Sequence, residues 1–98
     1  MKYKVLIRPE VEADLTHIYR WYEEHSAGLG ADFLRTVDAN LISIQRYPSG
    51  YPIIHKQVRR SLLRRFPYSL FYLAHDDTIV VLACFHAKRD PRKLKLRF

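Results

Sequence analysis

The sequence predicts an α+β fold, with an N-terminal strand and an α-helical hairpin packed on one face of a mainly antiparallel three- to four-stranded sheet. A short β-favouring run opens the chain, two stretches with apolar residues at helical spacing follow, and the second half is rich in β-branched and aromatic residues. The helical hairpin has one apolar stripe to bury, and the sheet offers the surface that buries it. With 98 residues the chain has room for one core, so residues 1–98 are expected to form a single domain.

The first half of the chain is predicted to hold one strand and both helices. Residues 3–7 favour a strand, and Pro9, followed by several acidic side chains, suits the first turn of a helix. Residues 26–28 end this helix, and a second one runs from about residue 29 to 47, where Pro48 stops it. A link this short between two amphipathic helices predicts an antiparallel hairpin.

The second half is predicted to form strands over residues 58–63, 69–75 and 78–85. Asp76 and Asp77 make a tight turn, so the last two strands form a β-hairpin. The residues expected to line the core beneath the helices are Val11, Leu15, Ile18, Phe33, Val37, Leu41, Ile44, Leu70, Tyr72, Val81 and Ala83.

Both faces of this last β-hairpin are apolar in sequence. Leu70 and Tyr72 alternate with Phe71 and Leu73, and the strand over 78–85 has apolar residues at nearly every position. The helical hairpin can cover one face only. We therefore expect the second face to be covered by the C-terminal tail or by a partner.

The positive charge is confined to the second half. Residues 1–49 hold six basic and seven acidic side chains, for a net charge of −1, whereas residues 50–98 hold eleven basic and three acidic ones, for +8. Such an asymmetry indicates a nucleic acid, a nucleic-acid-bound enzyme or an acidic protein as partner.

No conventional catalytic signature occurs, and the histidines have no metal-ligand spacing with Cys84, so neither a metal nor a cofactor is expected. The lone cysteine rules out an internal disulfide and fits a reducing compartment. No apolar run approaches the length of a membrane span, and the N-terminus does not resemble a signal peptide. We expect a cytoplasmic protein with no membrane partner.

Two basic clusters with aromatic neighbours are the strongest functional signal. Guanidinium groups beside aromatic rings suit phosphate contact and base stacking, and they suit carboxylate pairing equally well. The first cluster contains Lys56, Arg59, Arg60, Arg64 and Arg65, and the last eleven residues contain Lys88, Arg89, Arg92, Lys93, Lys95 and Arg97. The sequence alone does not distinguish contact with phosphates and bases from pairing with carboxylates.

RNA cleavage is one chemistry that these residues permit. It needs a general acid, a general base and cations for the developing phosphorane charge. His86 is a candidate acid or base, with Arg59, Arg60 and Arg89 as the candidate charge clamp. A histidine at a strand end is also commonly structural, so whether the protein is an enzyme stays open.

Taken in order, these segments resemble toxins of the RelE/ParE family. The residues that carry the resemblance are 58–60, 65–68, Phe71 with Tyr72, Phe85 with His86, and 89–91, together with Pro9, Glu12, Asp14 and Pro48 in the first half. The resemblance covers nearly the whole chain and comes from the ordered set rather than from a single motif.

The resemblance implies the toxin component of a type II toxin–antitoxin system, held in a hetero-oligomer by a cognate antitoxin whose C-terminal segment wraps it. The apolar residues expected to bind the antitoxin are Phe71, Leu73, Val80 and Leu82.

Two mechanisms occur within the family: inhibition of DNA gyrase and replication in ParE-like members, and ribosome-dependent mRNA cleavage in RelE-like ones. The ending from His86 to Pro91 and the scarcity of lysines on the central strands favour the ParE branch. The expected target-binding residues are Arg59, Arg60, Arg64, Arg65, Tyr68, His86, Arg89 and Lys93. The ribosome with its mRNA remains the alternative target, and a non-toxic nucleic-acid-binding module remains a third possibility.

Overall fold

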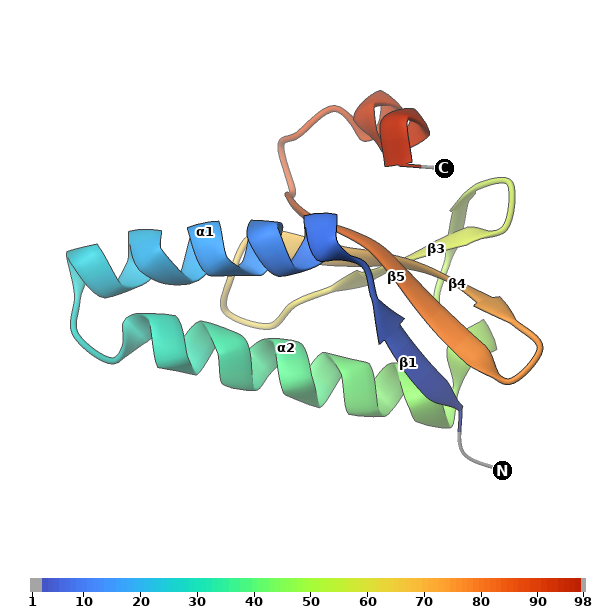
Figure 1. The fold of residues 1–98 in the computed structure, drawn as a ribbon, viewed down its shortest axis with the longest axis horizontal. Coiled ribbons are helices and arrows are strands. Elements are labelled where there is room, and N and C mark those ends of the chain that lie inside the picture. The colour runs from blue at the N-terminus through green and yellow to red at the C-terminus, as the bar shows by residue number, and fades with distance from the viewer. Residues whose placement is uncertain (1–2, 98) are drawn as a thin grey trace.

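A computed structural model describes residues 3–97, so residues 1, 2 and 98 of the predicted domain lie outside the described part. The α+β class and the helical hairpin are confirmed (Figure 1). In chain order the elements are β1 (Lys4–Ile7), α1 (Pro9–His25), α2 (Leu29–Arg46), the 3₁₀ helix η1 (Pro48–Gly50), β2 (Ile53–His55), β3 (Val58–Leu62), β4 (Tyr68–His75), β5 (Thr78–His86) and the 3₁₀ helix η2 (Pro91–Arg97). Within residues 3–97, no helix combines the length and the apolar character that crossing a membrane requires.

The sheet has five strands in the order β1-β5-β4-β3-β2. β1 runs parallel to β5, and the other neighbours are antiparallel. The expected number of three to four strands was therefore too low. The unforeseen strand is β2, which has only three residues and joins β3 through a two-residue turn at Lys56 and Gln57. So short an edge strand leaves almost no periodic signal in the sequence.

The turn between α1 and α2 is held by a side chain from the preceding helix. Gly28 adopts the left-handed region at φ 87°, where a side chain would be strained, and it cannot cap α2 itself. The Glu23 carboxylate accepts hydrogen bonds from the backbone N–H groups of Gly28, Gly30 and Ala31, at 3.2, 2.8 and 3.3 Å. It thus supplies the acceptor that the start of α2 lacks.

The helical hairpin covers one face of the sheet and forms the larger core with it. Eight of the predicted core residues are buried there: Val11, Ile18, Phe33, Val37, Ile44, Leu70, Tyr72 and Val81. Leu15 and Leu41 pack against this core but are only partly buried. Ala83 contradicts the prediction, because it lies in a second cluster on the opposite face.

A β-bulge in β5 explains the position of Ala83. Phe71 pairs with Ala83 but the next residue, Tyr72, pairs with Val81, so Leu82 is an extra residue in β5. Beyond the bulge the alternation is inverted, and Cys84 rather than Ala83 joins the core beneath the helices. The prediction assumed strict alternation along the whole strand.

Candidate partner-binding surfaces

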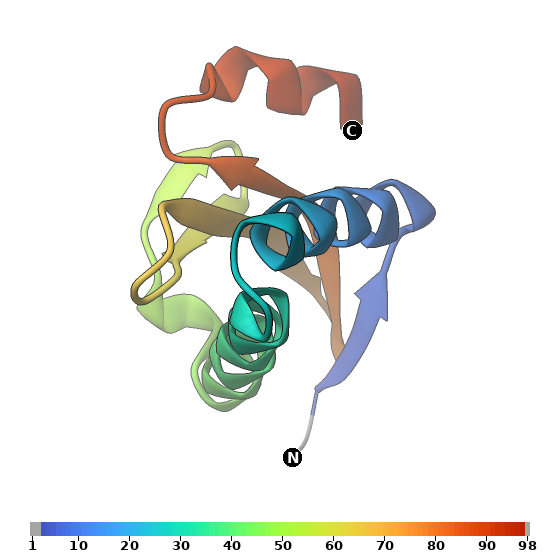
Figure 2. The same cartoon turned by 90° about the vertical axis from the view of Figure 1, so that its left-hand side faces the viewer.

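The second face of the sheet is partly covered by η2, which lies on the side opposite α2 (Figure 2). Leu94, 1 % exposed, packs there with the second cluster of buried residues, which includes Phe71, Leu82 and Phe85. The C-terminal tail therefore covers a part of the apolar face, which was one of the two expected outcomes. It is a single short helix, and it leaves neighbouring apolar side chains less well covered.

An ion pair between α1 and η2 fixes this cover. The Arg97 guanidinium donates to both carboxylate oxygens of Asp14, at 2.9 and 3.0 Å, and both side chains are largely buried. The hydrogen bond to Asp14 raises the pKa of Arg97 above its usual value. Arg8 adds a third contact, since its Nη1 donates to the Arg97 carbonyl oxygen at 2.7 Å.

Asp14 and Arg97 also form hydrogen bonds with backbone groups at the outer edge of β5. β1 ends at Ile7 opposite Val81, so the remainder of β5 has no strand on that side. The Cys84 N–H donates to Asp14 Oδ2 at 3.1 Å, and Arg97 Nη1 donates to the Leu82 carbonyl at 3.2 Å. Two side chains from opposite ends of the chain thus pair the backbone groups that the bulged edge would otherwise leave without a hydrogen bond.

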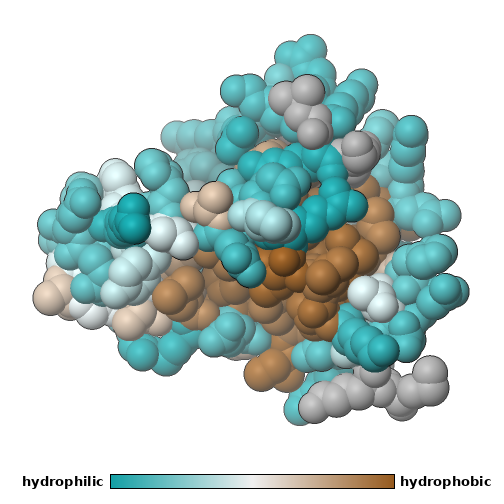
Figure 3. All heavy atoms as spheres, viewed as in Figure 1, coloured by the Kyte–Doolittle hydropathy of each residue, from teal (hydrophilic) through white to brown (hydrophobic). Residues whose placement is uncertain are grey.

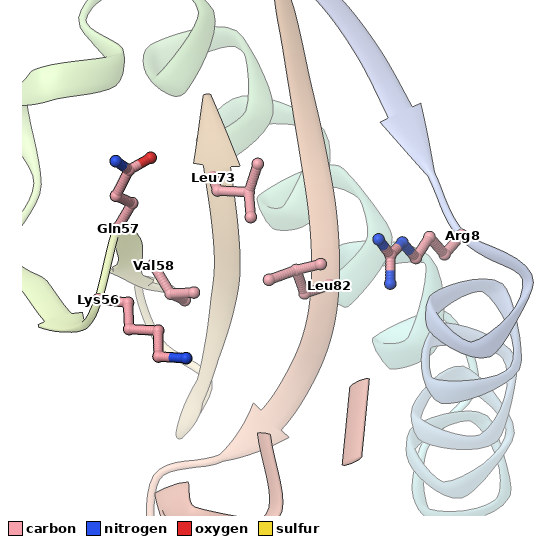
Figure 4. A pocket seen from close by; sticks show the side chains of 6 residues that line it. All are labelled: Arg8, Lys56, Gln57, Val58, Leu73 and Leu82. Carbon is pink, nitrogen blue, oxygen red and sulfur yellow. The ribbon is translucent and has the colours of Figure 1, made fainter. Parts of the chain in front are cut away.

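Beside η2, an apolar groove of about 440 Å³ opens on the second face (Figure 4). Its apolar floor consists of Leu73, which is half-exposed, above the buried side chains of Val58 and Leu82, and Arg8 and Lys56 lie at its opposite sides. Gln57 also lines the groove, so its lining by the described residues contains two cations and no acid. This composition fits a partner segment that has both apolar and acidic side chains.

The four residues expected to bind an antitoxin differ in accessibility. Leu73 and Val80 are half-buried at the surface of the second cluster. Phe71 is 6 % exposed and Leu82 is fully buried, so the described structure places both beneath the surface. A partner in the groove reaches Leu73 directly.

The expected target-binding residues divide between the two ends of the sheet. Arg64, Arg65, Tyr68, His86 and Arg89 gather at one end, where the Ala87 N–H donates to the Pro67 carbonyl at 2.7 Å and joins the two loops. Arg64 is exposed, and Arg65 lies 4.0 Å from Asp32. Lys93 is exposed on η2.

Arg59 and Arg60 lie elsewhere. The Arg59 guanidinium donates to the Tyr51 carbonyl at 2.6 Å and the Ser49 carbonyl at 3.2 Å, next to η1. Arg60 is exposed in the middle of β3, opposite Phe71. His86, by contrast, pairs with Tyr68 at the start of β4. The structure thus brings Arg89 to His86 but does not bring Arg59 and Arg60 into that group.

His86 and Arg89 line a hollow of about 420 Å³ against α1. The Tyr68 and His86 rings meet edge to face, 5.1 Å apart, and the Arg89 guanidinium lies 3.8 Å from the centre of the Phe85 ring. Burial raises the pKa of Tyr68, and the nearby thiol of Cys84 adds to the shift. Burial also raises the pKa of Cys84 to about 12, with the charge of Asp14 contributing. At neutral pH both groups are therefore protonated, and Cys84 is no nucleophile.

Sequence reasoning missed several residues of these surfaces. His17 lines the hollow from α1, although a histidine on the polar side of a helix gave no functional signal. Asp14 pairs with Arg97 across 83 positions of sequence, a contact that no local pattern reveals. Arg8, which follows β1, lines the groove together with Lys56, and of these two only Lys56 belonged to a predicted basic cluster.

A further apolar patch lies between α1, α2 and β1 and faces the viewer in Figure 3. Leu6 on β1 and Ile42 on α2 are each 54 % exposed. β1 is also an edge strand of the sheet. Leu6 pairs with Val80, which pairs with Leu73, so Leu6 lies on the second face of the sheet in the same cross-strand row as the groove residue Leu73. Ile42 belongs to α2, which covers the first face.

An N-terminal strand, a helical hairpin and a five-stranded mixed sheet that the hairpin covers on one face make up the RelE/ParE-like fold. A solved structure described as the chromosomal ParDE TA system from P. aeruginosa contains a chain with this fold, at a TM-score of 0.76 and 19% sequence identity, and the alignment covers 87% of this chain and 96% of that one. No curated protein sequence matches. The family model for the ParE toxin of the type II toxin–antitoxin system parDE matches residues 5–91, so the chain belongs to this family.

Proposed function

We propose that this protein inhibits DNA gyrase, and thereby replication, and that a cognate antitoxin neutralises it by inserting a segment into the groove beside η2. The groove is the observation that supports the antitoxin site. It offers an apolar floor on the incompletely covered sheet face, and it has a cation at each side. Burial of the apolar anchors gives a slowly dissociating complex, while Arg8 and Lys56 speed the approach of an acidic segment.

Leu73→Asp tests the antitoxin site. A carboxylate in the apolar floor should weaken the complex with the product of the neighbouring gene by about a hundredfold or more, because the charge loses its water on binding. Ile42→Asp is the control, since Ile42 is an exposed apolar side chain on α2, which covers the opposite face of the sheet. Titration calorimetry on both variants, with circular dichroism as a check of folding, decides the outcome. Unchanged affinity of a folded Leu73→Asp protein would overturn the groove as the binding site.

Gyrase is proposed as the target on family membership together with the dispersal of the candidate catalytic residues. A nuclease needs its cations around the reacting phosphate, whereas Arg59 is bound at the η1 end of the sheet, away from His86. The cations that do gather at the His86 end suit a contact surface. Inhibition through such a surface should fall gradually as single charges are removed.

Arg64→Glu and Arg89→Glu, alone and together, test this surface. We expect each reversal to weaken inhibition of purified gyrase by about threefold and the pair to multiply the two effects. Arg20→Glu and Arg46→Glu, which change the same charge on exposed helix residues, are the controls. In cells, trapped DNA breaks should accumulate while translation continues. Cleavage of mRNA in purified translation reactions, abolished by His86→Ala, would instead establish the ribosome-dependent mRNA endonuclease.

A further inference from the structure

The hollow beside α1 has a chemistry of its own. Its walls come from three parts of the chain: Ala13 to Ile18 of α1, the β4–β5 end with Tyr68, Cys84 and His86, and the turn that carries Arg89. A volume of about 420 Å³ lies within the range of small-molecule sites. His17 and His86 thus face one space although they are distant in sequence.

Among the described residues, Asp14 is the only acid that lines the hollow, and it is already neutralised. Both oxygens of Asp14 accept from the Arg97 guanidinium, and Oδ2 also accepts the Cys84 N–H. Asp90, the acid next to Arg89 in sequence, pairs with Arg92 at 2.8 Å. The groups left to interact with a ligand are His17, His86, Arg89 and the Tyr68 hydroxyl, and they are hydrogen-bond donors or cations.

Two of these donors are held in place. His86 Nδ1 accepts the Lys88 N–H at 3.0 Å, so the proton of the neutral ring is on Nε2, which is then a donor. The Arg89 guanidinium stacks on Phe85 and makes no ion pair with any residue in the described part of the chain. A charged group that is positioned by a ring but has no counter-ion is suited to receive an anion from outside.

We propose that this hollow binds a phosphate group. A carboxylate has two oxygens in one plane, which the fork of a single arginine satisfies. A phosphate has oxygens spread tetrahedrally, which suits donors arriving from α1, from the end of β5 and from the following turn. The phosphate belongs either to a free nucleotide or to a nucleic-acid strand. The site does not depend on the gyrase proposal, because its test uses the purified full chain alone.

The test follows the histidine ring signals by NMR during titration at constant pH and ionic strength. Inorganic phosphate should shift the His17 and His86 signals saturably and leave His75, at the far β4–β5 turn, unchanged. Tighter binding of adenosine monophosphate than of phosphate indicates a nucleotide, and tighter binding of a short single-stranded DNA indicates a nucleic acid. Glutarate, a dicarboxylate of similar charge, should bind more weakly.

Arg89→Gln should weaken phosphate binding about tenfold, the effect of losing one charge-assisted hydrogen bond. Arg64→Gln removes the same charge at the same end of the sheet and should leave the affinity within about twofold. His17→Gln, an exposed change that spares the fold, should also weaken binding and serves if Arg89→Gln does not fold. Equal losses in Arg64→Gln and Arg89→Gln, equal binding of glutarate, or no saturable shift would each overturn the proposal.

Discussion

The two faces of the sheet are covered in very different ways. On the first face, α1 and α2 supply a continuous apolar surface, and fully buried side chains such as Val11, Phe33 and Ile44 meet it from two helices. On the second face, the described cover is η2, which contributes the buried Leu94 and the ion pair of Arg97 with Asp14. The first face therefore contains most of the buried core, whereas the second face stays incompletely covered and is available to a partner.

This difference assigns most of the folding stability to the first face and leaves the second face for binding. A cover that depends on a few contacts at the end of the chain has a low free energy of local opening. The groove beside η2 is open at Leu73 without any movement, whereas Phe71 and Leu82 are buried in the cluster that contains Leu94 of η2. A partner can therefore bind the groove first and extend its contact as η2 shifts. The predictions below test whether the two faces are as unequal as the packing indicates.

The largest expected effect is on the first face. Phe33→Ala should lower the free energy of unfolding by about 3–5 kcal/mol, because the ring is fully buried and its loss leaves a cavity among Tyr22, Phe66 and Tyr68. Ile42→Ala on the same helix is the control, since that side chain is 54 % exposed. Urea unfolding should show a large loss for Phe33→Ala and almost none for Ile42→Ala. Similar losses for the two would contradict the assigned buried face of α2.

A smaller effect is expected on the second face. Arg97→Gln leaves the Asp14 carboxylate without its partner, which costs about 3–5 kcal/mol when the charge stays buried. Because η2 can swing away and admit water to Asp14, we expect a loss of only about 1–3 kcal/mol. Hydrogen exchange should accelerate in η2 while β4 keeps its protection. The double variant Asp14→Asn with Arg97→Gln should recover part of the loss, and additive losses would show that the pair is not coupled.

Much of the fold could be predicted because local patterns encode it. Helical periodicity gives both helices, and the Asp76–Asp77 turn between two β-rich runs gives the β4–β5 hairpin. The bulge at Leu82 could not be predicted, because one extra residue in an all-apolar strand changes no pattern. The candidate site shows the same limit, since contacts such as Asp14 with Arg97, or His17 facing His86, join segments that share no local signal.

The smallest expected effect, measured per unit of pH, appears in alkali and belongs to the first face. Burial raises the pKa of Cys84 from an ordinary value of 9.0 to about 12, and burial, partly offset by the charge of Arg59, raises that of Tyr72 from 10.0 to about 12. Both groups belong to the core beneath the helices. The folded chain holds these protons more tightly than the unfolded chain, so the stability they contribute is complete below about pH 9 and is lost as the pH rises toward 12.

The slope that each group contributes has an upper limit of about 1.4 kcal/mol per pH unit. Cys84→Ala should make the alkaline decline shallower, starting from pH 9.0, because the buried thiol no longer has to ionise on unfolding. Urea midpoints measured over a pH series give this slope for both proteins. Since Cys84 lies on the helix-covered face, the loss should appear as cooperative global unfolding rather than as early detachment of η2. An unchanged slope in Cys84→Ala, or faster exchange confined to η2 in alkali, would contradict this assignment of the titrating groups to the first face.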